Sequence, residues 1–248
     1  MSLEVKHLTH TYSAGSAFQA TAVHDVSLTI EDGEFVCIVG HTGSGKSTLV
    51  QHLNGLLKPS EGTILFNGEN IWAQDYSRKT LRSKVGLVFQ YPEHQLFETD
   101  VFADVCYGPK NLGLEQGEIE RRAKKALELV GFPEKFFGQS PFELSGGQKQ
   151  RLAIARAIAK NPKICIFDDS FSALDLKTDA ALRGALSENV TDSTIIIVAQ
   201  RISTILHAEQ ILVLDEGRIV GKGTHEELLE HCEVYRQIAE SQLSASEL

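Results

Sequence analysis

One glycine-rich segment carries the clearest chemistry in this chain of 248 residues. It fits the pattern G-x-x-x-x-G-K-[ST] and reads, in order, Gly40, His41, Thr42, Gly43, Ser44, Gly45, Lys46 and Ser47. Its glycines let backbone amides turn inward around an anion, and a helix that begins there adds partial positive charge. We expect Lys46 to reach the β and γ phosphates of a nucleotide and the Ser47 hydroxyl to bind Mg²⁺. The run and Thr48 are therefore the predicted phosphate-binding residues, with no individual role for His41. The alternative is a merely flexible loop.

Two adjacent aspartates form a second candidate site. They are Asp168 and Asp169, and they follow the short apolar segment Ile164 to Phe167 directly. A carboxylate at the end of such a strand can hold the magnesium ion of a bound nucleotide. We expect Asp168 to be that ligand. Asp169 has no role from this pattern alone, and one interpretation is a solvated acidic residue in the loop after the strand.

These residues need a framework, and the apolar pattern indicates an α/β fold. Segments 35–39, 85–89, 164–167 and 195–198 are short apolar runs. Strands that are apolar on both faces are typical of a covered, mostly parallel sheet. Helical patterns lie between them, one with apolar residues at Ile119, Ala123, Ala126, Leu127 and Val130, and another expected from about 147 to 159.

The C-terminal part has two local signals. Residues 211–215 and 218–220 flank Glu216-Gly217 and predict a β-hairpin. Thr224 and Glu227 have the spacing of a helix capping box. The mostly helical stretch from about 91 to 160 separates the glycine loop from the aspartates, and it predicts a helical subdomain inserted in an α/β core.

Composition excludes several classes of protein. The chain is 42% hydrophobic and 23% charged with a formal net charge of −9, so we expect no nucleic-acid partner. No apolar run approaches the roughly 20 residues of a membrane helix, and no signal peptide is evident at the start. The four cysteines match no metal spacing, and this predicts a reduced, cytosolic setting.

A glycine-containing segment before the expected 147–159 helix completes a family pattern. It reads Leu144, Ser145, Gly146, Gly147 and Gln148. Alone it would be a Ser145 N-cap with flexible glycines. Together with the phosphate loop, it resembles the signature motif of ABC-type ATPases, and the resemblance covers essentially the whole chain. The implied fold has a P-loop (RecA-like) core sheet, an N-terminal antiparallel β portion and an inserted α-helical subdomain.

The resemblance also implies roles for single residues. Gln90 matches the Q-loop glutamine, so the implied magnesium ligands are Ser47, Gln90 and Asp168. Tyr12 matches the aromatic residue that stacks on adenine, with Phe18 as a less favoured substitute.

The resemblance implies a head-to-tail dimer that encloses two ATP molecules. The residues that would act across the dimer are Ser145, Gly146, Gly147, Gln148 and, in the D-loop Ser172-Ala173-Leu174-Asp175, Asp175. The expected cofactors are ATP and Mg²⁺, and the expected partners are a second ATPase subunit, identical or different, and separate transmembrane transporter subunits. The expected location is cytoplasmic, peripheral on the cytoplasmic face of the membrane when bound to a transporter.

The two halves resemble different branches of the family. Residues 89–97 resemble ATPase subunits of energy-coupling-factor importers, whereas 167–170, 198–203 and 228–242 resemble the degenerate-site domain of heterodimeric exporters. We therefore expect a single domain, 1–248, that is a hybrid joined near 145–165, by design or recombination; an unusual natural sequence is the alternative. The core would be about 1–90 and 161–248, and the helical subdomain about 91–160.

The predicted catalytic residues are Lys46, Asp169 and Gln200. In the family, a glutamate polarises the attacking water where this chain has Asp169, and a histidine contacts the γ-phosphate where it has Gln200. The aspartate is shorter by roughly 1.5 Å, and glutamine cannot carry a positive charge. Both changes predict good ATP binding with weak hydrolysis. The alternative function is a non-hydrolysing or engineered ATP-binding domain without a transport partner.

Overall fold

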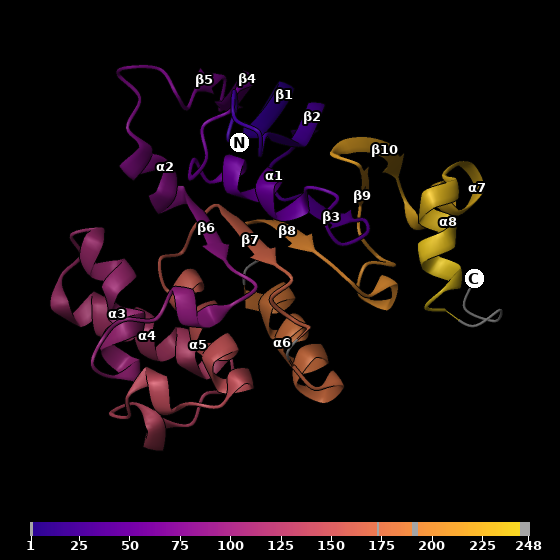
Figure 1. Cartoon of the computed structure of the whole chain (residues 1–248). Coiled ribbons are helices and arrows are strands. Elements are labelled where there is room, and N and C mark those ends of the chain that lie inside the picture. The colour runs from indigo at the N-terminus through magenta and orange to yellow at the C-terminus, as the bar shows by residue number, and fades with distance from the viewer. Residues whose placement is uncertain (1, 173, 190–192, 244–248) are drawn as a thin grey trace. The chain divides into compact units, whose positions relative to one another are not determined.

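The computed structural model describes residues 2–172, 174–189 and 193–243 (Figure 1). They form two compact units. Unit 1 comprises Met1–Arg82 and Thr194–Leu248, and unit 2 comprises Ser83–Ser193. The predicted division into a core and a 91–160 subdomain stays a prediction.

Unit 1 contains a four-stranded antiparallel sheet in the order β2-β1-β4-β5. Its strands are β1 (Leu3–Tyr12), β2 (Ala20–Ile30), β4 (Glu61–Phe66) and β5 (Glu69–Asn70). Leu3, Val5 and Leu8 of β1 are fully or almost fully buried, while Lys6 and His7 between them are exposed. This one-sided burial explains why β1 forms part of a sheet with one apolar face.

Unit 1 also holds strands in the order β10-β9-β3-β8. They are β3 (Phe35–Val39), β8 (Thr194–Val198), β9 (Gln210–Asp215) and β10 (Arg218–Gly223). β3 pairs in parallel with β8 and β9, as its continuous apolar sequence predicts. β9 and β10 form the predicted hairpin, in which Glu216 (φ 44°) and Gly217 (φ 76°) are both left-handed. That geometry matches the twist of the paired strands.

The helices of unit 1 include α1 (Lys46–Leu53), α7 (His225–His231) and α8 (Glu233–Glu240). Helix α2 (Arg78–Lys84) has its first five residues in unit 1 and its last two in unit 2. The predicted capping box is present at α7. The Thr224 amide donates to the Glu227 carboxylate (2.8 Å), and the Glu227 amide donates to the Thr224 hydroxyl (3.4 Å). These bonds satisfy amides that a helix start would otherwise leave unpaired.

Unit 2 combines a parallel strand pair with a helical group. The strands are β6 (Val85–Val88) and β7 (Ile164–Asp168), and the helices are α3 (Val101–Asn111), α4 (Gln116–Leu129), α5 (Gly146–Ile158) and α6 (Leu176–Asn189). Helices α3, α4 and α5 lie together (Figure 1) and contact one another pairwise. The predicted apolar face of α4 is buried, as periodic spacing requires. The alternating strands and helices confirm the α/β class.

A buried charge in unit 2 holds α3 against the loop that precedes it and against α5. The Asp104 carboxylate is fully buried, accepts from the amides of Phe97 and Glu98, and lies 2.9 Å from the Arg156 guanidinium. A buried carboxylate is tolerated only when such partners replace water. Asp104 therefore holds the loop before α3 and the side of α5 together.

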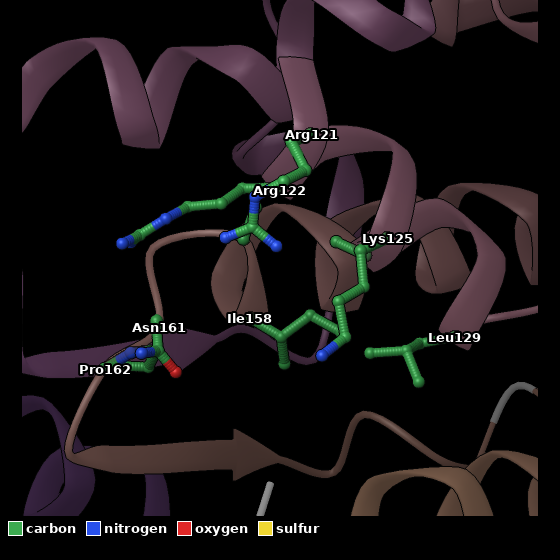
Figure 2. A pocket seen from close by; sticks show the side chains of 9 residues that line it. Arg121, Arg122, Lys125, Leu129, Ile158, Asn161 and Pro162 are labelled. Carbon is green, nitrogen blue, oxygen red and sulfur yellow. The ribbon is translucent and has the colours of Figure 1, made fainter. Parts of the chain in front are cut away.

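A cavity of about 150 Å³ lies in unit 2 beside α4 and the end of α5 (Figure 2). Arg121, Arg122 and Lys125 line it from α4, and Ile158 lines it from α5. Both guanidinium groups bind Glu118 at 2.7 Å and lower the pKa of that carboxyl to about 2. Both arginines are therefore paired with a carboxylate on the same helix, and this pairing explains their presence without a bound ligand.

The four cysteines are buried free thiols. Among the described residues, every helix is too short or too polar to cross a bilayer.

Candidate nucleotide-binding site

The phosphate loop lies in unit 1 between β3 and α1, as its sequence pattern requires. Gly40 has φ 150° and Gly45 has φ 98°. A Cβ on Gly40 would collide with the carbonyl oxygen of Leu214, and one on Gly45 with that of Ala22. Both positions therefore require glycine for backbone conformation and for space.

Lys46 lies folded over this loop. Its ammonium donates to the carbonyl oxygens of Gly40 (2.7 Å) and His41 (2.8 Å). The charge thus lies within the loop that is predicted to hold phosphate. An anion with negative oxygens at the loop would compete with these neutral carbonyls for the ammonium.

Tyr12, the predicted adenine-stacking residue, is held by one ring contact and by its hydroxyl. The ring meets His10 edge-on, with centroids 4.5 Å apart and planes at 81°. The hydroxyl lies 3.3 Å from the Thr48 hydroxyl, on the helix that starts at Lys46. Tyr12 keeps 41% of its surface exposed, and Phe18, the substitute, is 87% exposed. The structure therefore places Tyr12 beside α1 and gives Phe18 little contact of its own.

Two histidines support this arrangement, and sequence reasoning missed both. His10 contacts His52 with ring centroids 4.6 Å apart. The fully buried His52 donates through Nδ1 to the Thr48 carbonyl at 2.7 Å. Burial lowers the pKa of His52 to about 4, with the nearby His10 adding to the effect against the opposing Thr48 hydrogen bond. His52 is therefore a neutral ring at neutral pH. The alternating His10-x-Tyr12 pattern on a strand was the available signal.

Unit 2 brings three of the predicted residues together. Asp168 ends β7 and is 3% exposed, and Asp169 is 8% exposed. The Gln90 amide donates to the Asp169 carboxylate at 3.0 Å. This bond uses the Gln90 nitrogen and leaves the amide oxygen as the available metal-ligand atom. A hydroxyl, an amide oxygen and a carboxylate are a donor set that suits Mg²⁺, so the predicted ligands fit that ion chemically.

Asp169 has an uncommon backbone conformation. Its φ is 49°, in the left-handed region that aspartate tolerates better than most residues. Its carbonyl accepts from the Ser172 hydroxyl at 3.0 Å, and the buried Ser170 hydroxyl donates to the Val88 carbonyl at 3.1 Å. These local bonds hold the turn after β7 and fix the backbone position from which the Asp169 side chain extends.

The signature segment forms the start of α5. Ser145 is the N-cap, and Gln148 completes a capping box by accepting from the Ser145 amide at 2.9 Å. Ser145 and Gly146 are exposed, and a Cβ on Gly146 would meet open space. The helix start is thus accessible, and Gly146 is not required by packing within this chain.

Part of the predicted D-loop can be described. Asp175 is exposed and accepts from the Thr178 hydroxyl (2.6 Å) and amide (3.0 Å), which lowers the pKa of its carboxyl. It therefore caps the start of α6. Ala173 of the same loop lies outside the described residues.

Gln200 follows β8 in unit 1 and is exposed. Its carbonyl accepts from Gln242 Nε2 at 2.8 Å, and the Gln242 oxygen accepts from the Ile202 amide at 2.9 Å. Gln242 lies just after α8 and holds the loop that carries Gln200 through these two hydrogen bonds. No sequence signal pointed to this contact.

Comparisons with known proteins agree with this geometry. A family model described as ABC transporter matches residues 23–172, more than half of the chain. The energy-coupling factor transporter ATP-binding protein EcfA2 of Clostridium perfringens is 43% identical over 242 residues, which are 96% of this chain and 85% of that protein.

Two solved structures are similar over most of the chain. One is cbiO1 from Clostridium perfringens, described as part of the ABC transporter complex cbiONQ, with 36% identity, a TM-score of 0.76, and 96% and 94% of the two chains covered. The other is the dimeric ATP-binding cassette MJ0796 bound to ADP and Pi, with 31% identity, a TM-score of 0.83, and 90% and 98% covered.

These matches answer two expectations from the sequence. The α/β fold with an antiparallel N-terminal sheet, a P-loop sheet and a helical subdomain is confirmed. The match to EcfA2 covers both expected halves, so it gives no support to a hybrid origin. The glycine loop, the paired aspartates and these matches lead to one conclusion: the chain belongs to the ABC transporter family.

Proposed function

We propose that this protein is the ATP-binding subunit of an energy-coupling-factor type ABC transporter, and that it hydrolyses ATP to power transport. The observation that carries the proposal is the phosphate loop between β3 and α1, with Gly40 and Gly45 in conformations that only glycine adopts readily. The similarity to EcfA2 supports the transporter type. Ser47, Gln90 and Asp168 would hold Mg²⁺ beside the phosphates, where the ion would neutralise developing charge.

We further propose that two subunits associate head to tail around ATP. The exposed N-terminus of α5, with Ser145 and Gly146, offers amides that can bind a phosphate from a facing subunit. The similarity to the dimeric cassette MJ0796 supports this arrangement. Asp175 would lie at the same interface, which in a homodimer would be two-fold symmetric.

Transmembrane subunits would bind exposed aromatic residues of unit 2. Tyr91 is 55% exposed, Phe97 51% and Tyr107 39%. Phe97 and Tyr107 meet edge-on at 4.6 Å, and the Arg156 guanidinium lies over both rings. Exposed aromatic rings held rigidly in this way favour protein contact. This assembly would place the protein at the cytoplasmic face of the membrane.

We propose that hydrolysis is weakened. The Asp169 carboxylate is one carbon–carbon bond shorter than a glutamate and is bound to Gln90, and Gln200 offers no positive charge. Misplacing a catalytic group by about 1 Å can cost on the order of 100-fold in rate. Phosphate binding would be spared because Lys46 and the loop are intact.

Steady-state phosphate release from the purified protein with Mg-ATP tests this proposal. We expect Asp169→Glu and Gln200→His to raise turnover, and the pair together to raise it most. Asp75→Glu, which adds the same methylene to an exposed loop carboxylate, is the matched control. Wild-type turnover equal to that of a competent ABC ATPase, or no gain from either change, would refute weakened hydrolysis.

A non-hydrolysing ATP-binding module is the second candidate function, and the altered pair Asp169 and Gln200 favours it. Co-purification with transmembrane subunits of an energy-coupling factor transporter separates the two. A transport subunit should bind them and lose binding with Tyr91→Asp, whereas a module without a transport partner should not bind.

A further inference from the structure

We infer that His10 is a positioning residue that fixes the orientation of Tyr12 and thereby sets the preference of the site for the adenine base. The inference rests on the proposed ATP-binding function. It adds a residue that acts through Tyr12 rather than by touching the nucleotide.

His10 is held on several sides. It is 9% exposed, and its Nδ1 donates to the Lys58 carbonyl at 3.2 Å. His52 packs against it at 69° between ring planes, and Tyr12 meets it at 81°. A ring with a hydrogen bond and two edge-to-face neighbours has little freedom to rotate. Since His10 and Tyr12 are two residues apart on β1, they share one face of the strand.

The same contacts connect Tyr12 to the phosphate loop. Thr48 and His52 both lie on α1, which begins at Lys46. Thr48 meets the Tyr12 hydroxyl at 3.3 Å, and its carbonyl accepts from His52. The Tyr12 ring and the helix α1 that follows the loop are therefore fixed to each other through His10, His52 and Thr48. Because 41% of Tyr12 remains exposed, the ring still has surface for a base.

The size of the effect follows from the ring contacts. An edge-to-face aromatic pair contributes roughly 0.5–1.5 kcal/mol beyond buried area, and 1.4 kcal/mol is tenfold in affinity. Loss of the His10 ring should therefore weaken ATP binding by roughly twofold to twelvefold. Inorganic triphosphate has no base, so its affinity should not change.

The experiment measures dissociation constants for Mg-ATP and Mg-triphosphate on the full chain. His10→Ala should lower the ATP-to-triphosphate preference, and turnover at saturating ATP should stay the same. His10→Phe keeps an aromatic ring against Tyr12 and should retain most of the preference. His7→Ala is the matched control, because His7 lies on the same strand but is exposed and pairs with Asp25.

A double-mutant cycle with Tyr12→Ala distinguishes the possible failures. The inference holds if His10→Ala changes the preference only when Tyr12 is present. If Tyr12→Ala changes the preference and His10→Ala does not, His10 has no positioning role. If both changes leave the ATP-to-triphosphate preference unaltered while ATP still binds, Tyr12 does not stack on the base. The positioning role of His10 is then refuted as well. If His10→Ala does not fold, His10→Leu against His10→Phe gives the same comparison.

Discussion

His52 makes the stability of unit 1 sensitive to pH in a defined window. Burial lowers its pKa from the usual 6.5 to about 4. Between pH 6.5 and 4, His52 is protonated in the unfolded chain and neutral in the folded chain. Lowering the pH therefore favours the unfolded state. The stabilisation is complete above about pH 6.5, falls as the pH is lowered, and is lost below about pH 4. The full difference is on the order of 3 kcal/mol.

The test compares the wild type with His52→Leu by urea unfolding at several values from pH 7.5 to 4. The single tryptophan, Trp72, lies in unit 1 with His52, so its fluorescence reports the relevant unit. Other titrating groups act in both proteins and cancel in the difference. The wild type should lose up to about 3 kcal/mol relative to the variant as the pH falls from 6.5 to 4. Parallel loss of stability in the two proteins would refute the reasoning, and His52→Gln repeats the test if leucine is not tolerated.

Three further predictions follow from single contacts. Gly45→Ala should abolish ATP binding measured by calorimetry, because a Cβ there meets a backbone carbonyl of β2 at φ 98°; retained affinity would contradict the loop geometry. Asp104→Ala should cost about 3–5 kcal/mol of unfolding free energy, because it leaves the Arg156 charge and two amides without their carboxylate; a loss below about 1 kcal/mol would show that the pair is solvated. Gln242→Ala should lower phosphate release several-fold with unchanged ATP affinity, because the Gln200 loop loses two hydrogen bonds; unchanged turnover would show that these bonds are irrelevant to catalysis.

Features that depend on neighbouring residues could be predicted from the sequence. The β9–β10 hairpin follows from two residues that adopt positive φ, and the α7 cap follows from a three-residue spacing. The phosphate loop is local in the same sense, because glycines and a helix start define it. Its strand and helix were therefore placed correctly.

Features that depend on tertiary packing could not be predicted in this way. His10 and His52 meet only because β1 lies beside α1, and Gln242 reaches Gln200 across 42 positions of sequence. The expected hybrid origin failed to find support for a related reason. The expectation rested on short segments such as 167–170 and 198–203, whereas the similarity to EcfA2 extends over 96% of the chain at 43% identity. Short segments were therefore a poor guide to origin.

The proposed head-to-tail association requires Mg-ATP to bring two ATPase subunits together, and two copies of this chain are the pair to test. Light scattering of the purified protein after size-exclusion chromatography tests it most directly, because weak hydrolysis should let the ATP-bound dimer persist. We expect a dimer in Mg-ATP, and a monomer in ADP or when Lys46 is changed to alanine. A monomer under all three conditions, with ATP shown to be bound, would contradict it.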